Sequence, residues 1–240
     1  MGDLQAQLVS WRGEGARIGP LPGDEGSARL TFLSPDRPPS QELVAHCMSR
    51  LASLAYSRAL TSAVGAATES VLAACGFQVA EEMVVLTKQL DRDQPSAVPP
   101  PGFSLRRSRR RSASGVLLLD AASFPPEWRL GGMGLREALR ATPRSRMSIV
   151  HGPHPAGYAI TGMGHTGGFV QRLAVSPEHR RAGIGTALLS DGLAWLHRQG
   201  AVQATVNTQS TNQVALSLYR RLGFERSSQR MAVMSVSKFN

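Results

Sequence analysis

The chain has 240 residues, of which 42% are apolar and 18% charged, and this composition excludes an intrinsically disordered protein. No uncharged apolar run is long enough to span a bilayer, and the N-terminus lacks a basic start followed by an apolar core. We therefore expect no membrane segment and no signal peptide. Two cysteines, Cys47 and Cys75, indicate a reducing compartment, the cytoplasm, and no disulfide framework.

The net charge of +10 is unevenly distributed along the chain. Up to Pro95 there are 8 Lys and Arg against 11 Asp and Glu, whereas from Ser96 onward there are 19 against 6. The basic second part should attract an anion, which could be a nucleic acid or a phosphorylated cofactor. Charge alone leaves both open.

A polar, proline-rich segment at 91–102 can continue neither a helix nor a central strand, and it predicts a linker. A tail with the first elements at 1–27 and a folded segment at 28–90 would precede it, and a larger domain at 103–240 would follow. In the first part we expect strands at 28–33, 58–63 and 82–86 and helices at 40–54 and 68–74.

In the second part, runs with the periodicity of strands alternate with runs with the periodicity of helices in an α+β order. We therefore expect a mixed β-sheet flanked by helices. The expected strands are 102–107, 148–150, 158–163, 168–175, 202–207 and 231–236, and the expected helices are 112–122, 134–141, 183–199 and 212–222. In both parts a Gly-Phe pair, Gly76-Phe77 and Gly223-Phe224, ends a helical run before a strand. The pairs indicate a duplicated supersecondary unit, although a helix ending in Gly-Phe also arises by chance.

The sharpest motif lies at 173–186, where a strand ends and a basic, glycine-containing loop opens a long helix. A helix N-terminus presents unpaired N–H groups and about half a positive charge. Gly183 and Gly185 would let a phosphate approach the backbone, and Arg180 and Arg181 add charge at the same place. The loop lacks the Gly-Lys-Ser/Thr ending of a Walker motif and the glycine spacing of a dinucleotide fingerprint. It predicts a pyrophosphate cradle.

The pattern Arg180-x-x-Gly183-x-Gly185 resembles the cofactor motif of the GNAT family of N-acetyltransferases. Leu173-x-Val175-x-Pro177 before the loop, Val206-Asn207 at the end of the next strand, and the helix from Asn212 to the Gly223-Phe224 turn agree with the family in order and spacing. The resemblance covers 103–240. It implies a GNAT-type fold, acetyl-CoA as the donor and an amine as the acceptor.

The resemblance also implies roles for individual residues. The pyrophosphate of acetyl-CoA should bind the N–H groups of the loop, the pantetheine arm should pair with the strand, Asn212 and Asn207 should face the cofactor, and Tyr219 should protonate the departing thiolate. Direct attack by the amine needs only positioning and proton transfer. The implied cofactor-binding residues are Leu173, Ala174, Val175, Arg180, Arg181, Ala182, Gly183, Ile184, Gly185, Thr186, Asn207 and Asn212.

Each role has a structural alternative. Tyr219 could be a core aromatic of an amphipathic helix, Asn207 could cap a loop, and Arg180 and Arg181 could form a solvated face. Many family members carry a glutamate as base on the strand that we expect at 168–175, but this chain has Gln171 and no carboxylate there. Glu127, His151 and His165 are nearby alternatives, and a water relay or an amine that arrives neutral would serve equally, so the base stays unassigned.

The segment 28–90 resembles a second, degenerate half of the same fold. Its loop at 34–40 has no glycine and little positive charge, and Leu72 stands where the repeat places Tyr219. We expect a smaller, structural half-domain without a cofactor site. In the larger domain, the run Phe124-Pro125-Pro126-Glu127-Trp128 falls where the family's acceptor-site loop lies, although both aromatics could equally be core.

The sequence thus predicts an acetyl-CoA-dependent N-acetyltransferase that acts on a primary amine, with no metal site. The acceptor could be a small molecule, as in the tandem enzymes of mycothiol synthesis, or a protein N-terminus or lysine. A catalytically silent acyl-CoA sensor is the alternative. The arginine run Arg106, Arg107, Arg109, Arg110 and Arg111 could contact RNA, but the exposed end of a first strand explains it more simply. The sequence does not predict the oligomeric state.

Overall fold

The computed structural model describes residues 6–34, 37–91, 98–108, 113–165, 167–237 and 239. The chain forms two compact units. Unit 1 consists of Met1–Val84, Gln209–Thr211 and Ser228–Asn240, and unit 2 consists of Val85–Thr208 and Asn212–Ser227. No helix in the described part of the chain is long and apolar enough to cross a membrane.

The predicted elements occur in the expected order, several of them extended at their ends, and the structure adds strands that the sequence did not predict. In the first half the elements are β1 (Gln7–Trp11), β2 (Glu14–Leu21), β3 (Asp24–Phe32), α1 (Gln41–Ser53), β4 (Arg58–Thr61), β5 (Val64–Gly65), α2 (Ala66–Ala74) and β6 (Gln78–Gln89). In the second half they are β7 (Ser104–Arg107), α3 (Ala113–Ser123), α4 (Gly132–Arg140), β8 (Arg144–His151), β9 (Pro155–Met163), β10 (Gly168–Val175), α5 (Ile184–Arg198), β11 (Gln203–Gln209), α6 (Gln213–Arg221) and β12 (Glu225–Val236).

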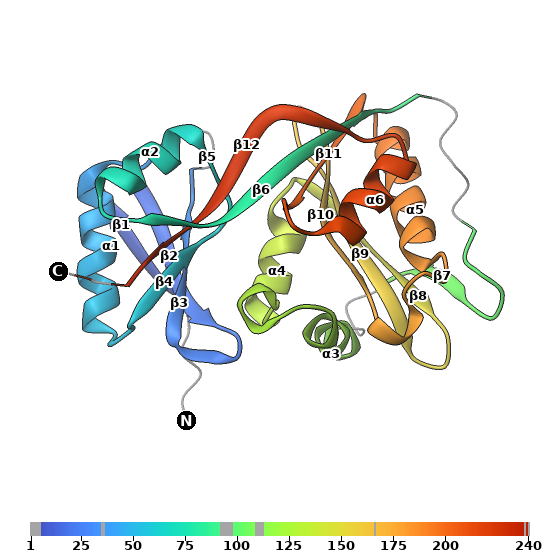
Figure 1. The fold of residues 1–240 in the computed structure, drawn as a ribbon, viewed down its shortest axis with the longest axis horizontal. Coiled ribbons are helices and arrows are strands. Elements are labelled where there is room, and N and C mark those ends of the chain that lie inside the picture. The colour runs from blue at the N-terminus through green and yellow to red at the C-terminus, as the bar shows by residue number, and fades with distance from the viewer. Residues whose placement is uncertain are drawn as a thin grey trace. The chain divides into compact units, whose positions relative to one another are not determined.

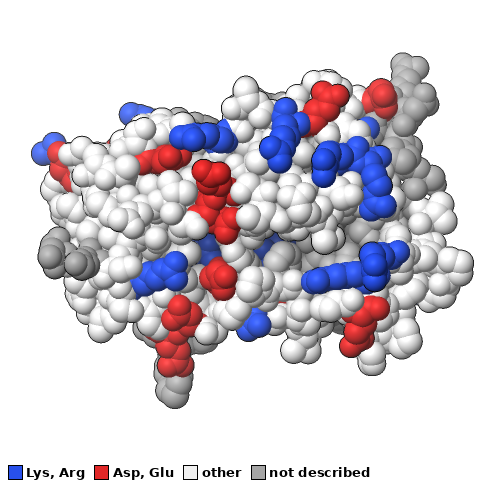
Figure 2. All heavy atoms as spheres, viewed as in Figure 1, with Lys and Arg blue, Asp and Glu red and all other residues white. Residues whose placement is uncertain are grey.

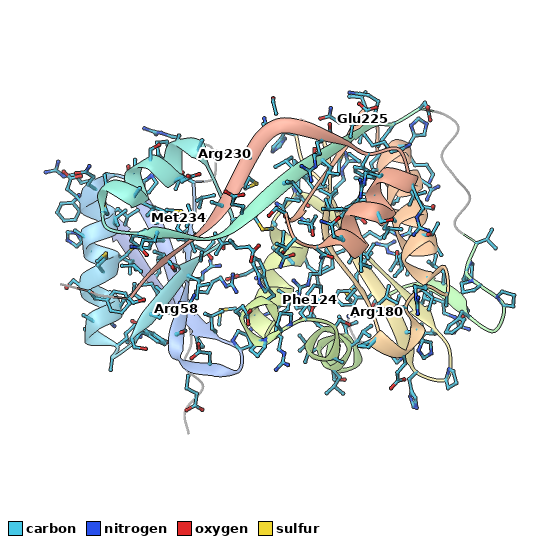
Figure 3. All side chains as sticks on the ribbon, in the orientation of Figure 1. Arg58, Phe124, Arg180, Glu225, Arg230 and Met234 are labelled. Atoms are coloured by element: carbon cyan, nitrogen blue, oxygen red, sulfur yellow. The ribbon has the colours of Figure 1, made fainter. Side chains whose placement is uncertain are left out.

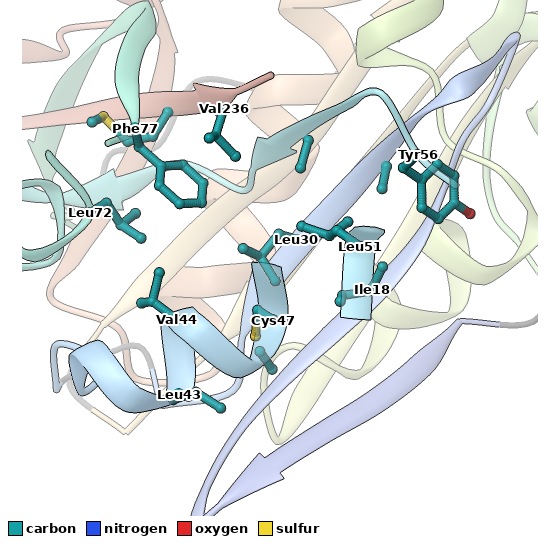
Figure 4. Close-up of a cluster of buried hydrophobic side chains, with 14 of the residues drawn as sticks. Ile18, Leu30, Leu43, Val44, Cys47, Leu51, Tyr56, Leu72, Phe77 and Val236 are labelled. Atoms are coloured by element: carbon teal, nitrogen blue, oxygen red, sulfur yellow. The ribbon is translucent and has the colours of Figure 1, made fainter. Parts of the chain in front are cut away.

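Unit 1 is built on the strand order β1-β2-β3-β4-β12, with β5 also paired to β12. Helix α1 buries Leu43, Cys47 and Leu51 against Leu30 of β3 and Leu72 of α2 (Figure 4). Burial raises the pKa of the Cys47 thiol to about 12, so Cys47 behaves as a small apolar residue of the core.

Unit 2 has the strand order β6-β11-β10-β9-β8-β7, in which β10 and β11 are parallel and β7 to β10 are antiparallel. Helices α3 and α4 cover one face of β8–β10 and α5 covers the other (Figure 1). On the α5 face Ile184 and Leu188 pack on Ala156 and Ala159 of β9. On the opposite face Leu119 packs on Tyr158. The expected mixed sheet flanked by helices is confirmed.

The two halves of the chain exchange strands. Strand β6 begins in unit 1 and ends in unit 2, whereas β12 begins in unit 2 and ends in unit 1, where Ser235 pairs with Leu60 of β4. Figure 1 shows the red end of β12 running beside the blue-green β4. The compact units therefore differ from the segments predicted from the sequence, 28–90 and 103–240. Within the predicted linker at 91–102, residues 92–97 lie outside the described residues. The expected tail at 1–27 contains the β1–β2 hairpin.

The repeated Gly-Phe pairs form the same turn in both units. Gly76 and Gly223 have φ of 87° and 82°, a left-handed conformation that a side chain would strain. Phe77 N donates to Leu72 O at 3.0 Å, and Phe224 N donates to Tyr219 O at 3.0 Å. Both are Schellman-type helix ends. The turns place Leu72 and Tyr219 at equivalent positions, as the proposed duplication requires.

Close packing of β9 against α5 generates a first prediction. A Cβ added at Gly157 would lie 2.7 Å from Ile184 Cγ2 and 3.0 Å from both Ala174 O and Leu188 Cδ1. Because these neighbours are buried, we expect Gly157→Ala to lower the free energy of unfolding by about 1–3 kcal/mol, the usual cost of overpacking. Urea denaturation followed by circular dichroism would measure it.

Gly115→Ala in α3 is the matched control, because its added Cβ would meet only Pro155 Cγ at 3.4 Å. Alanine is the better helix former by up to roughly 1 kcal/mol, so this control should keep or raise the stability. Equal stability of the two variants would contradict the packing described here.

Candidate active site

The loop between β10 and α5 leaves a helix N-terminus open. A 3₁₀ turn, Pro177–His179, leads to Arg181 at φ 65° and Gly183 at φ 88°. Gly183 is the N-cap of α5, and no side chain caps this helix. Because the first N–H groups of a helix have no intrahelical partner, they can bind an anion.

Most residues of this loop are exposed, and one is a buried anchor. Ile184 is buried in the core between α5 and β9, whereas Arg180, Arg181, Ala182, Gly183 and Thr186 are exposed. The expected cradle residues therefore surround one uncapped helix start.

Gly185 shows which other elements meet this helix start. A Cβ at Gly185 would lie 3.2 Å from Leu218 Cδ2 of α6 and 3.7 Å from Val175 Cγ2 of β10. The loop, the end of β10 and the helix that carries Tyr219 thus converge. Leu173, Ala174 and Val175 all lie on β10, as expected.

The parallel strands β10 and β11 part almost at once. They pair only at Gly168↔Ala204 and Phe169↔Thr205, whereas β10 stays paired with β9 as far as Val175↔Gly157. A bulge at Gln171, between Val170 and Arg172, interrupts β10 at the point of divergence. Backbone groups on the β11 side of Leu173 to Val175 therefore lack a neighbouring strand, and buried backbone groups require a partner.

Tyr219 lies within α6 with only 5% of its surface exposed. Its ring packs against Phe224 at 5.7 Å between centroids, and its hydroxyl makes no hydrogen bond within the described residues. Burial raises the pKa of Tyr219 to about 12, so the hydroxyl keeps its proton at neutral pH. This state suits a proton donor, and the packing also suits a core aromatic.

The two asparagines differ in their surroundings. Asn212 caps α6, since its Oδ1 accepts from Ala215 N at 3.1 Å and its Nδ2 donates to Thr208 Oγ1 at 3.2 Å. Asn207 is exposed on β11. A cofactor contact for either residue stays a prediction. In the case of Asn212, one side chain would have to cap α6 and contact the cofactor as well.

Sequence reasoning missed a buried network beside the site. Asp120 of α3 is fully buried and accepts from Arg172 of β10 at 2.6 Å and from the hydroxyl of Tyr158. Burial raises the pKa of Tyr158, so this hydroxyl remains a donor. The signal was present, because Asp120 is the only charged residue in the apolar run of α3.

The general base remains unassigned. Gln171 Nε2 donates weakly to Thr142 Oγ1 at 3.4 Å, and its Oε1 is buried without a partner among the described residues. Glu127 is exposed in a short turn, and His151 ends β8. His165 lies in the turn after β9. Within the described residues, no group of His, Cys, Asp or Glu could hold a metal ion.

The equivalent region of unit 1 is closed. Strands β3 and β4 are also parallel, but they stay paired from Ser27↔Arg58 to Leu30↔Thr61. At the start of α1 the carboxylate of Glu14 accepts from Ser40 N at 3.0 Å and from Ser40 Oγ at 2.6 Å. A cavity of about 50 Å³ remains beside Glu14, far below the roughly 300 Å³ of small ligand pockets.

The arginine run is described only in part. Arg106 and Arg107 are exposed on β7, the last strand in the order of unit 2, as the strand-end interpretation expects. Arg109, Arg110 and Arg111 lie outside the described residues. Figure 2 shows Lys and Arg side chains spread over the visible face with Asp and Glu among them, so this face carries no uniform basic surface.

A known protein family matches the part of the chain that contains these strands and the uncapped helix. The model of the acetyltransferase (GNAT) family matches residues 114–224. This match likens the second part of the chain to GNAT acetyltransferases. The match contains the loop, α5, β11 and α6, and it ends at Phe224.

Related proteins extend the likeness beyond residues 114–224. The chain is 28% identical over 232 residues to the mycothiol acetyltransferase of Thermobispora bispora, a match that covers 85% of this chain and 78% of that protein. It is 38% identical over 76 residues to the mycothiol acetyltransferase of Arthrobacter sp., covering 32% of this chain and 20% of that protein.

Solved structures agree in fold. A tandem GNAT protein from the clavulanic acid biosynthesis pathway has a TM-score of 0.64 at 20% identity, covering 93% of this chain and 78% of that chain. A GCN5-related N-acetyltransferase from Sphaerobacter thermophilus has a TM-score of 0.62 at 17% identity, covering 93% and 76%.

Glu14 generates a prediction about pH. Hydrogen bonds from Ser40 hold the pKa of Glu14 below its ordinary value of 4.5. A carboxylate with a lowered folded pKa stabilises the fold above its unfolded pKa, and this contribution is lost as the pH falls through the folded pKa. We expect Glu14→Gln to melt at a lower temperature than the wild type at pH 7, and this difference should shrink as the pH falls through the folded pKa of Glu14. A difference that does not change with pH would show that the charge of Glu14 does not act on α1.

Proposed function

We propose that unit 2 transfers an acetyl group from acetyl-CoA to a primary amine by direct attack of the amine. The parting of β10 and β11 beside the uncapped start of α5 carries this proposal. The open backbone of β10 fits an extended pantetheine arm, and the exposed loop with its free N–H groups fits a pyrophosphate.

In this mechanism the loop residues from Arg181 to Thr186 bind the pyrophosphate through their N–H groups, and the guanidinium of Arg180 adds charge. Backbone groups of Leu173 and Val175 bind the pantetheine arm in the manner of a neighbouring strand. One of these N–H groups stabilises the oxyanion that forms when the amine attacks the thioester carbon. Tyr219 then donates its proton to the departing thiolate, and its phenolate regains a proton from the amine nitrogen, which loses one as the amide forms.

The acceptor we propose is a small-molecule amine. The match to mycothiol acetyltransferase and the tandem GNAT structure both extend over most of the chain, which favours a two-part enzyme of that kind. The alternative acceptors are a protein N-terminus and a lysine, and a silent acyl-CoA sensor would show no turnover. Thiol release from acetyl-CoA with amines of these classes would separate the three outcomes.

Gly183 tests the cradle. Its left-handed φ of 88° is one that Asp and Asn tolerate better than other residues, and an added Cβ meets no atom within 4 Å. Gly183→Asp should therefore fold but lose acetyl-CoA binding, because like charges in contact cost several kcal/mol. Isothermal titration should give one acetyl-CoA per wild-type chain.

Gly183→Asn is the matched control, since it has the same shape without the charge, and it should keep measurable binding. Wild-type affinity in Gly183→Asp would place the cradle elsewhere. A stoichiometry of two would mean that unit 1 also binds the cofactor.

Tyr219 tests the chemistry. Tyr219→Phe removes only the hydroxyl and keeps the ring against Phe224, so the stability should change little. We expect kcat to fall by about 10²- to 10⁴-fold, the usual worth of general acid–base catalysis, with cofactor affinity nearly unchanged. Steady-state kinetics by thiol release would measure both. Full activity of this variant would show that the thiolate departs unaided and that Tyr219 is a packing residue.

A further inference from the structure

A single arginine ties the segment after α3 to the strand of the candidate site. We define this segment, residues 124–130, as the 124–130 loop. Arg172 of β10 donates from Nε and Nη2 to Asp120 Oδ2 at 2.9 and 2.6 Å, and from Nη2 to Trp128 O at 2.7 Å. The guanidinium thus bridges α3 and the backbone of the loop.

The carboxylate of Asp120 completes this connection. Its Oδ1 accepts from Leu130 N at 2.7 Å, and its Oδ2 also accepts from the hydroxyl of Tyr158. Asp120 is fully buried, and the Arg172 side chain is 14% exposed. A buried ion pair stabilises only when hydrogen bonds satisfy its remaining groups, and this pair has them. Both ends of the loop are therefore held by one buried pair.

The flat guanidinium has a second role. Its Cζ lies 3.5 Å from the centroid of the Phe124 ring, a cation–π contact that holds the first side chain of the loop. Lysine could keep a charge near Asp120, but it lacks the planar fork that stacks on Phe124 and reaches Trp128 O as well. The position of the ring therefore depends on arginine.

The base of the loop also contacts the proposed cofactor site. Arg180 Nη2 donates to Ser123 O at 3.3 Å, and Ser123 Oγ lies 3.3 Å from Val175 O at the end of β10. Figure 3 labels Phe124 and Arg180 within this part of unit 2. An amine that attacks a thioester held along Leu173 to Val175 must pass close to the 124–130 loop.

We propose that Arg172 is a positioning residue that fixes the 124–130 loop and thereby determines which amines reach the thioester. This proposal rests on the proposed function. Arg172 holds Phe124 by its ring and Trp128 by its carbonyl, so the loop presents one surface to the acceptor. Loosening the loop relaxes the selection among amines, whereas acetyl-CoA binds to backbone groups of β10 and to the helix start of α5, which do not depend on the Arg172 side chain.

The chain contains a matched control for this experiment. Arg146 of β8 forms a similar pair with Asp191 of α5 at 2.8 Å, with side-chain exposures of 16% and 10%. Asp191 also accepts from a hydroxyl, that of Ser148, at 2.6 Å. Arg146→Lys therefore disturbs a comparable ion pair that does not contact the 124–130 loop.

The first measurement uses Trp128 as a reporter of the loop. In full-length chains that carry Trp11→Phe and Trp195→Phe, Trp128 is the only tryptophan left. Arg172→Lys should raise acrylamide quenching of Trp128 fluorescence, and Arg146→Lys should leave it unchanged. Phe124→Leu, which keeps the ion pair but removes the stacked ring, should act in the same direction as Arg172→Lys. Unchanged quenching in both loop variants would overturn the fixation of the loop by Arg172.

The second measurement compares thiol release from acetyl-CoA with glucosamine, an alanyl dipeptide and Nα-blocked lysine. Arg172→Lys should reduce the ratio of kcat/KM between the best and the worst amine by roughly tenfold, since small misplacements near reacting groups cost this much or more. Arg146→Lys should keep the wild-type ratio, and both variants should keep acetyl-CoA affinity.

The outcomes separate the two proposals. An unchanged ratio in Arg172→Lys would overturn the selective role of the loop. If the wild type released no thiol with any amine, the proposed function and the selective role would both fail. The quenching of Trp128 would then still decide whether Arg172 holds the loop.

Discussion

The early parting of β10 and β11 is the constraint on which the candidate site depends. Two parallel strands that pair at only two positions leave backbone donors and acceptors without a neighbouring strand, and these groups need another partner. The helix between the strands begins beside the same opening and has no side-chain cap. One divergence thus produces both a strand edge for an extended ligand and a helix start for an anion.

Unit 1 shows how the same supersecondary unit behaves when the opening is absent. Its parallel strands stay paired over four positions, and Ser62 N continues the pairing by donating to Leu30 O. At the start of α1 the chain itself supplies a negative charge, the carboxylate of Glu14, which accepts hydrogen bonds from Ser40. The start of α1 thus follows the preference of a helix N-terminus for an anion. Of these two helices, α5 is the one without a side-chain cap, and its start is open to a ligand.

The sequence predicted the features that depend on local chemistry. Strand β10 has the expected bounds, and α5 and α6 begin and end within one residue of them, because glycine and apolar periodicity are read directly from neighbouring residues. Contacts between distant residues could not be read in this way. The exchange of β6 and β12 depends on which edge each strand meets, and the pairing of Asp120 with Arg172 spans 52 positions. The lone charge of Asp120 in an apolar helix indicated that this residue has a partner, but not which residue the partner is.

Leu72 and Tyr219 occupy equivalent positions, and this equivalence bears on the role of the Tyr219 hydroxyl. Both residues accept, through their carbonyl oxygen, the N–H of the phenylalanine in the closing turn, so the backbone around them is the same. Leu72 fills its position fully buried in the core of unit 1, which shows that an apolar side chain satisfies the packing at this place. The hydroxyl of Tyr219 adds no hydrogen bond within the described part of the chain. Packing therefore accounts for the ring but not for the hydroxyl, and burial keeps that hydroxyl protonated.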